Sequence, residues 1–362
     1  MAAPQAFFYI ESQFDNLGDA LINREQLKLM AEHADVTAGI SCVPHSFQQM
    51  MGLEFLNSLN LDKTSGRSRF LLNILLKKLR GHQCYLFLSP GGWIGELDGR
   101  LNLRSWVHTL LYYMLALSGV KICQVGVSYE DLGFKLSLML RARSRAMHSH
   151  YVRDPLSQKT MTDMSVRIDG ICPDLAFYAF EDAESRHNPD AVTFSFRADQ
   201  YPKQLEDIKQ FISLFLAYYG VERPVYFASQ VKKDDKYNKE LAAWVSETYG
   251  IQASMDCGSD VIADTEALYR RSSVMVSNRL HSLLLAGSVG NAMVAAPITQ
   301  HNKKITALFN DIGLAHHVFN ASDMQEKATA SHMEKICREV FNASEKKRML
   351  SEHFDKLFNN AG

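Results

Sequence analysis

The sequence contains 362 residues, of which 46% are hydrophobic and 22% are charged, as is typical of a globular protein. This length is too great for one ordinary hydrophobic core and predicts two domains of similar size. The 39 Lys and Arg residues nearly balance the 40 Asp and Glu residues, so we expect no nucleic-acid partner, because nucleic-acid-binding proteins are usually strongly basic.

In the first half of the chain, short apolar segments alternate with amphipathic segments of helical length. This alternation is typical of βαβ units, which build a parallel sheet with helices on both faces. The predicted strands are 6–10, 36–43, 84–89, 121–127 and 148–153, and the predicted helices are about 18–32, 66–80, 102–118 and 132–145.

The alternation breaks at residues 171–190, a polar segment bounded by Pro173 and Pro189. It then resumes with predicted strands at 191–196, 224–229, 273–277 and 292–296, and an amphipathic helix at about 332–358 follows. The sequence therefore predicts an α/β fold of two Rossmann-like, doubly wound domains that face a cleft. We expect an N-terminal domain over 1–185, a C-terminal domain over 186–335 and a closing helix within 336–362.

Ligands of doubly wound folds bind beyond the carboxyl ends of the strands, so the residues after each strand are the candidates. After the strand at 273–277, Asn278 is a good N-cap that makes Arg279 the first helical residue and His281 the third. Cations in the first turn of a helix interact unfavourably with the helix dipole, at a cost of roughly 0.3–1 kcal/mol each. They indicate an anion bound at this helix N-terminus.

A similar arrangement follows the next strand, where Asn302 can cap a helix that starts with Lys303 and Lys304. Arg279, His281 and one lysine can then converge on a ligand with more than one negative charge. The alternative is that these cations are solvated side chains at fraying helix ends.

In the first domain, the turn after the first strand has Asn16 as a candidate cap and Gly18 as a point of close approach. Asp19 lies in the first turn of the helix, where the dipole favours an acid, so it can either cap the helix or address a ligand. The segment "SPGGWIGELDG" places Gly91 and Gly92 in a predicted backbone loop near a ligand.

Two further arginines follow predicted strands. Arg153 is the last residue of the strand at 148–153 and can either point into the cleft or pair with Asp154. Arg197 comes directly after the strand at 191–196.

The six cysteines are scattered without a CxxC pair, which predicts buried free thiols in a reducing compartment. The amino-terminal segment has neither the basic start nor the apolar core of a signal peptide. The longest apolar stretch, "WVHTLLYYMLALSGV", is short for a membrane span. We therefore expect a cytoplasmic protein.

Together, these segments resemble the polysaccharide pyruvyl transferase family of bacterial exopolysaccharide pathways, in particular its amylovoran- and colanic-acid-like members. "DNLGDALI", "PGGWIGE", "YVRDPLS" and "FSFR" are similar to its motifs and occur in the same order. The most specific likeness is "SNRLHSLLLAGSVGNAMVAA" followed by "KKI". The likeness spans about residues 6–315, and it departs from the family at Trp93, where small residues are common, and in the doubled lysine.

The resemblance implies a GT-B-like fold and transfer of the enolpyruvyl group of phosphoenolpyruvate to a sugar, which forms a cyclic ketal and releases phosphate. It implies no cofactor and no metal ion. The implied catalytic residues are His281 as general acid, Asp19 as base or orienting group, and Lys304. The implied donor-binding residues are Arg279, Arg153, Arg197, Lys303 and Asn278, and the implied acceptor-binding residues are Asn16, Gly18, Gly91 and Gly92.

The implied acceptor is a saccharide, with galactose as our expectation, or a lipid-linked oligosaccharide. Two basic amphipathic stretches, 67–82 and 134–150, can contact the inner face of a membrane or the acceptor's diphosphate, or can simply be core helices. A nucleotide-sugar glycosyltransferase of the same architecture is the main alternative, with Glu266 or Asp264 on the ribose. A carbohydrate-binding relative without catalysis is another.

Overall fold

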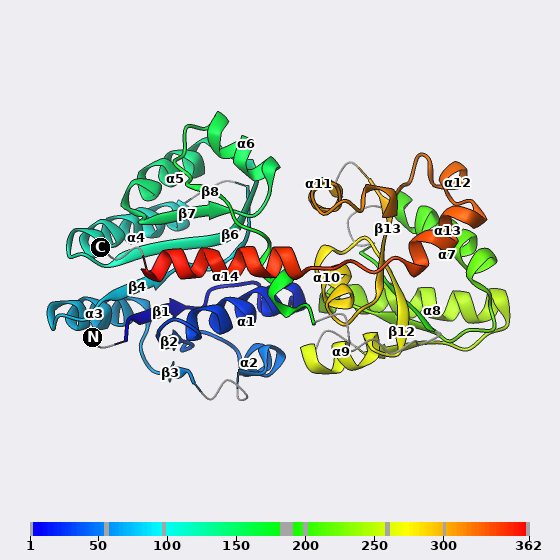
Figure 1. Cartoon of the computed structure of the whole chain (residues 1–362), viewed down its shortest axis with the longest axis horizontal. Coiled ribbons are helices and arrows are strands. Elements are labelled where there is room, and N and C mark those ends of the chain that lie inside the picture. Colours follow the sequence, from blue (N-terminus) through cyan, green and yellow to red (C-terminus); the bar gives the residue numbers. More distant parts are fainter. Residues whose placement is uncertain are drawn as a thin grey trace.

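The computed structural model describes residues 3–53, 58–95, 99–181, 191–197, 202–257, 261–299 and 302–359. The chain forms two lobes, and each lobe is a parallel sheet with helices on both faces (Figure 1). The predicted fold class is therefore confirmed. The predicted domain boundary at residue 185 lies outside the described residues.

The first lobe is built on an eight-stranded sheet with the order β3-β2-β1-β4-β6-β7-β8, in which β5 pairs with β6. Its strands are β1 (Gln5–Tyr9), β2 (Asp35–Gly39), β3 (Asn60–Asp62), β4 (Cys84–Phe87), β5 (Gly91–Gly95), β6 (Lys121–Leu132), β7 (Ser149–Val152) and β8 (Gly170–Ile171). Its helices are α1 (Leu17–Ala31), α2 (His45–Met51), α3 (Arg67–Leu79), α4 (Gly99–Leu117), α5 (Phe134–Ala146), α6 (Pro155–Asp163) and the 3₁₀ helix η2 (Leu175–Ala179).

The second lobe has a six-stranded sheet with the order β11-β10-β9-β12-β13-β14. Its strands are β9 (Ala191–Ser195), β10 (Val225–Ala228), β11 (Ala253–Cys257), β12 (Ser272–Ser277), β13 (Ala292–Ile298) and β14 (Val318–Asn320). Its helices are α7 (Pro202–Tyr219), α8 (Asp235–Tyr249), α9 (Ile262–Tyr269), α10 (Leu280–Ser288), α11 (Lys303–Asp311), α12 (Met324–Lys327) and α13 (Ala330–Arg338), with 3₁₀ turns η4 (Lys232–Asp234) and η6 (Ala315–His317).

Strand order reverses at the first strand of each sheet, between β1 and β4 and between β9 and β12. In the first sheet, Phe8 of β1 is opposite both Ala38 of β2 and Phe87 of β4. In the second, Phe194 of β9 is opposite both Phe227 of β10 and Val276 of β12. A crevice at such a reversal point is where doubly wound folds bind ligands.

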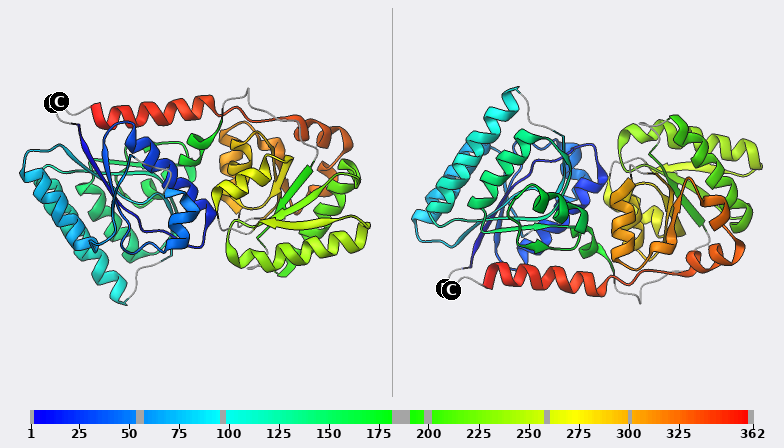
Figure 2. Two further views of the ribbon diagram at one scale, coloured as in Figure 1. Left: turned by 90° about the horizontal axis from the view of Figure 1, so that it is seen from below. Right: turned by 90° about the horizontal axis from the view of Figure 1, so that it is seen from above.

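The largest apolar cluster joins the two lobes. Leu17 and Leu21 of α1 belong to the same buried cluster as Leu283 and Leu284 of α10. Helix α14 (Ser344–Asn359) follows the second lobe but lies along the first (Figures 1 and 2). The Phe354 ring of α14 stacks on the Phe87 ring of β4 with centroids 5.7 Å apart.

Two sequence predictions about secondary structure are wrong. The Gly91–Gly92 segment is not a loop but the start of β5, which pairs along β6 from Gly91↔Val127 onward. The helix predicted at 332–358 is divided into α13 and α14, and in the segment between them the Asn342 side chain accepts a hydrogen bond from the Ser344 backbone N–H at the start of α14.

Two other expectations concern cysteines and membranes. Cys84, Cys123 and Cys172 are buried free thiols as predicted, whereas Cys42 is exposed, which corrects the expectation for that residue. Within the described residues, none of the helices is both long and apolar enough to cross a bilayer.

Candidate active site between the lobes

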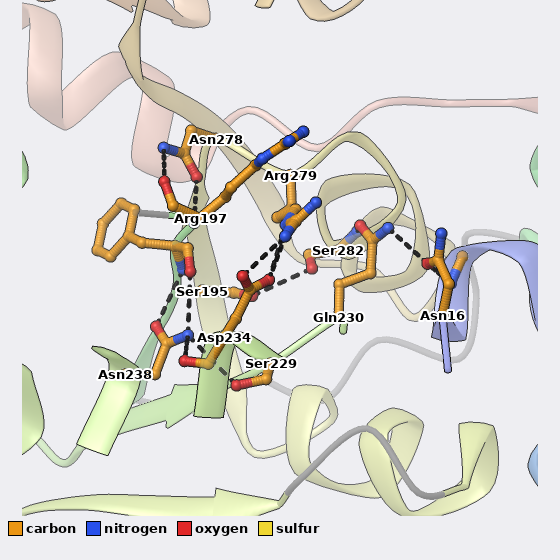
Figure 3. Close-up of polar contacts among 12 residues, drawn as sticks. Asn16, Ser195, Arg197, Ser229, Gln230, Asp234, Asn238, Asn278, Arg279 and Ser282 are labelled. Atoms are coloured by element: carbon orange, nitrogen blue, oxygen red, sulfur yellow. Dashed lines mark hydrogen bonds and ion pairs between the residues drawn. The ribbon is translucent and has the colours of Figure 1, made fainter. Parts of the chain in front are cut away.

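The turn that starts α1 contacts the second lobe directly. Asn16 is the N-cap of α1, and its side-chain oxygen accepts hydrogen bonds from the Gly18 N–H at 3.0 Å and from the Gln230 side-chain amide at 2.9 Å (Figure 3). The Leu17 N–H donates to the Gln230 carbonyl at 2.8 Å. Asn16 therefore both caps a helix and connects the lobes.

Gly18 is a point of close approach, as predicted, but the group that approaches it is a protein side chain. A Cβ atom at position 18 would lie within 2.8 Å of side-chain atoms of both His281 and Gln230. His281 lies in the first turn of α10, so the N-termini of α1 and α10 meet at this glycine.

His281 faces a buried carboxylate that reasoning from the sequence did not identify. Its Nε2 atom lies 3.5 Å from Oδ2 of Asp174, and the same oxygen accepts a hydrogen bond from Nη1 of Arg153 at 2.8 Å. Burial alone would raise the pKa of Asp174, but the charges of Arg153 and His281 lower it well below its usual range. Asp174 is thus ionised and can stabilise a protonated His281.

Asp19 lies at the edge of this cluster, on the first-lobe side. Its carboxylate accepts hydrogen bonds from Ser12 Oγ and the Gln13 N–H, both at 3.0 Å, and from the Asn16 amide at 3.2 Å. Burial raises the pKa of Asp19, while the Gln13 N–H and the charge of His281 oppose the increase. A carboxylate held by donors in this way can accept a bond from a sugar hydroxyl.

The two adjacent lysines of α11 point to different places. Lys304 Nζ lies 2.9 Å from Glu130 of β6 and 3.4 Å from the position that a Cβ on Gly92 would occupy, so it reaches across to the first lobe. Burial and the charge of Arg153 lower the pKa of Lys304. Lys303 is exposed and lines a separate hollow, formed mostly by second-lobe residues together with Leu156 of α6.

The predicted start of α10 needs a correction. Arg279 is the N-cap and Leu280 the first helical residue, because the Asn278 side chain does not cap the helix. It instead accepts from the Arg197 N–H at 2.7 Å and donates to the Arg197 carbonyl at 3.1 Å, which ties β12 to the end of β9 (Figure 3).

Arg279 makes a two-pronged ion pair with a buried acid. Its Nε and Nη2 atoms donate to the two carboxylate oxygens of Asp234 at 2.8 and 2.7 Å (Figure 3). Asp234 lies in η4, the turn beyond β10. The ligand-binding role inferred for Arg279 therefore has a structural alternative, in which the pair fixes the entry to α10.

The structure thus brings His281, Arg153, Lys304 and Asp19 to one cluster, with Gly92 beside it. Asp19 and Gly92 also line a cavity of about 530 Å³ in the first lobe. Asn302 is the N-cap of α11, as predicted, but its side chain accepts from Thr299 instead of from the helix.

Four residues with roles in this geometry are absent from the sequence-based assignment: Asp174, Glu130, Asp234 and Gln230. A local sequence pattern could have identified Asp174, because "CPD" follows a short strand and the Asp174 side chain caps η2 by accepting from the Ala176 N–H. The other three carry no such signal, because their partners are far away in the chain. Glu266, proposed for a ribose, pairs with Arg24 of α1 at 2.9 Å.

A group of potential metal ligands lies elsewhere. Atoms of His316, His317 and Glu339 lie within 4.8 Å of one another, and His317 Nδ1 is 2.8 Å from the Met293 carbonyl. Met293 is near the amino end of β13, so this group is at the sheet edge opposite the candidate site.

Comparisons with solved structures show the fold. A UDP-GlcNAc 2-epimerase from Methanocaldococcus jannaschii superposes with a TM-score of 0.55 at 10% identity, covering 96% of this chain and 99% of its own. A glycosyltransferase from Rickettsia africae has a TM-score of 0.56 at 10% identity with full coverage of both chains (100% each). An alpha-glucosyltransferase crystallised with UDP and DNA has a TM-score of 0.53 at 10% identity, covering 98% and 95%.

These neighbours have the GT-B architecture, and at such low identity the likeness concerns the fold alone. No curated protein matches the sequence significantly. The family model described as polysaccharide pyruvyl transferase matches residues 16–290, which is more than half of the chain and includes every residue of the cluster except Lys304. The chain belongs to the polysaccharide pyruvyl transferase family.

Proposed function

We propose that this protein transfers the enolpyruvyl group of phosphoenolpyruvate to a saccharide of an exopolysaccharide repeat unit, with galactose as the expected sugar. The product is a cyclic pyruvate ketal, and phosphate is released. Family membership supports pyruvyl transfer to a polysaccharide. The observation that carries the finer assignment is the convergence between the lobes of the His281 imidazole, the cations Arg153 and Lys304 with their carboxylate partners, and the carboxylate of Asp19.

The donor has a phosphate and a carboxylate, which need cations at fixed positions. We assign them to Arg153 and Lys304, both of which have further N–H donors for a ligand. Arg153 pairs with Asp174 at 2.8 Å and more loosely with Asp154 at 3.7 Å, and Lys304 pairs with Glu130 at 2.9 Å. Lys303 faces another hollow, so we assign the catalytic lysine to Lys304. Arg279, Arg197 and Asn278 then support the donor side by fixing the start of α10.

In the proposed reaction, protonated His281 gives a proton to the methylene carbon C3 of the donor, which leaves an oxocarbenium-like centre at C2. One sugar hydroxyl attacks C2 and transfers its proton to Asp19, and phosphate departs with its C–O electron pair beside Lys304. A second hydroxyl then attacks C2 and transfers its proton to the now neutral His281, which closes the ketal. The proton that Asp19 accepted leaves with the phosphate. Asp174 stabilises the imidazolium form of His281.

The first experiment is calorimetric titration with phosphoenolpyruvate and, separately, with nucleotide sugars. We expect saturable phosphoenolpyruvate binding, weakened about 10- to 100-fold in Lys304→Met because a charge-assisted contact is lost. Lys303→Met is the matched control, since its side chain is exposed, and should bind normally. Binding of a nucleotide sugar with no response to phosphoenolpyruvate would overturn the proposal and favour a glycosyltransferase.

We further propose that the first lobe contacts an anionic membrane through helices α3, α4 and α5. None of these three helices contains Asp or Glu, and they contain Arg69, Lys77, Lys78, Lys135 and Arg145 among their basic residues. Their exposed apolar side chains include Leu103, Val107, Leu110, Met114 and Leu117 of α4 and Leu72, Leu76 and Leu79 of α3. A second copy would bring like charges together, whereas anionic lipid complements them.

A further inference from the structure

The cavity of about 530 Å³ in the first lobe, which Asp19 and Gly92 of the candidate site also line, has a cationic wall. Arg67 of α3, Arg104 and His108 of α4 and Arg143 of α5 all line it. Its volume is within the range of small-molecule sites, about 300–1,000 Å³. None of these four side chains has a role in the transfer chemistry proposed above.

Arg143 is the key residue of this wall, because it is a buried cation without a carboxylate partner among the described residues. Only 5% of it is exposed. Its Nε donates to Thr109 Oγ1 at 3.4 Å and its Nη2 to the Ser105 carbonyl at 3.3 Å, both neutral groups. A buried charge that is paired only with neutral acceptors is costly, and an anionic ligand would relieve that cost.

The neighbouring charges do not neutralise Arg143. Glu11 forms an ion pair with Arg67, and its carboxylate also lies 4.0 Å from Arg104. Burial and the charges of Arg67, Arg104 and Arg143 lower the pKa of His108 to about 4, so this imidazole is neutral at pH 7. The pocket is therefore electropositive near Arg143.

The other walls suit a sugar. The guanidinium of Arg143 lies over the rings of Tyr112 and Trp93, at 5.2 and 5.8 Å from their centroids, and Tyr9 is a third aromatic lining residue. Tyr112 is buried under Arg143, so the partly exposed Tyr9 and Trp93 are the rings that can pack against the apolar face of a pyranose. Asp19 and Ser12, at the end nearer the second lobe, can bind hydroxyls.

We propose that this pocket binds an acidic acceptor saccharide, with the carboxylate or phosphate of that saccharide on Arg143 and its reacting hydroxyls toward Asp19. This proposal rests on the function proposed above and names the class of acceptor. A guanidinium can bind either anion through two parallel N–H bonds, so the shared chemistry is a negatively charged group attached to a sugar.

The test is calorimetric titration of the full chain with three probes: methyl galacturonide, galactose 1-phosphate and neutral methyl galactoside. We expect one or both charged probes to bind at least 10-fold more tightly than the neutral one, and the tighter of the two identifies the anion. Arg143→Gln should weaken the charged probes about 10- to 100-fold and leave the neutral probe and phosphoenolpyruvate unchanged. Arg145→Gln, an exposed position on the same helix, is the matched control.

Two results would overturn the proposal. One is equal binding of charged and neutral probes that Arg143→Gln does not alter. The other is loss of phosphoenolpyruvate binding in Arg143→Gln, which would mean that this pocket binds the donor and not the acceptor. Arg143→Lys keeps the positive charge but lacks the two parallel N–H donors of the guanidinium. It is titrated with the same probes if Arg143→Gln does not fold. Because native protein is titrated with phosphoenolpyruvate in parallel, failure of this inference is distinguishable from failure of the proposed function.

Discussion

At the scale of single residues, the candidate site depends on how one buried carboxylate is shared. Oδ2 of Asp174 is 2.8 Å from Arg153 Nη1 and 3.5 Å from His281 Nε2. The Arg153 contact holds Asp174 ionised, and the longer contact leaves the His281 nitrogen without a hydrogen bond. His281 is thus oriented toward a negative charge, and its Nε2 is buried with its hydrogen-bonding capacity unused.

Replacement of His281 tests this arrangement. We expect His281→Gln to lower kcat by about 10²- to 10⁴-fold, the usual contribution of a general acid, with less than a threefold change in phosphoenolpyruvate affinity. Phosphate release under saturating donor measures the rate, and calorimetry measures the affinity. His45→Gln, an exposed position on α2, is the control. Retention of full kcat would show that another group supplies the proton.

At the scale of elements, the sequence predicts the existence of most strands and helices because apolar alternation and caps are local, but their ends less well. The strand predicted at 36–43 ends at Gly39, and the strand predicted at 121–127 continues to Leu132. The apolar run of β1, the cap Asn16 and the acid Asp19 all lie within a few residues of one another. The strand β5 could not be predicted, since Gly91 and Gly92 are typical of loops and become a strand only by pairing with β6. Asp234 and Glu130 were missed because only the tertiary fold brings them to Arg279 and Lys304.

The contact between α1 and α10 makes a second prediction. Gly18→Ala should destabilise the protein by about 1–3 kcal/mol, because the new Cβ overlaps side-chain atoms of His281 and Gln230 and forces overpacking. It should also lower activity by displacing His281. Urea unfolding and phosphate release measure the two effects.

Gly66→Ala is the matched control for this glycine, because position 66 has open space around its Cβ and a φ of −60°. An alanine there should leave both stability and activity near native values. Native stability in Gly18→Ala would mean that the helix N-termini are not tightly packed against each other.

At the scale of the whole molecule, the two lobes share one apolar core, so the cluster between them is held on rigid elements. The first lobe also has a distinct outer end. Helix α4 (cyan) lies at the end of this lobe remote from the second one, while its inner face lines the acceptor pocket through Ser105, His108 and Tyr112 (Figure 2). A membrane at this end would be one helix thickness from the proposed acceptor site.

Vesicle binding measures this contact. We expect the protein to co-sediment with vesicles of phosphatidylglycerol and phosphatidylcholine but not with pure phosphatidylcholine, and to dissociate as salt increases, because each Lys or Arg near the surface contributes about 1 kcal/mol of screened attraction. Leu110→Glu combined with Leu117→Glu should abolish binding, since both side chains are exposed, Leu117 by 87%. Val221→Glu, at an exposed position of the second lobe, is the control. If the native protein is instead a dimer, the double variant a monomer, and neither protein binds vesicles, then this face joins two copies of the chain and the proposed membrane contact is wrong.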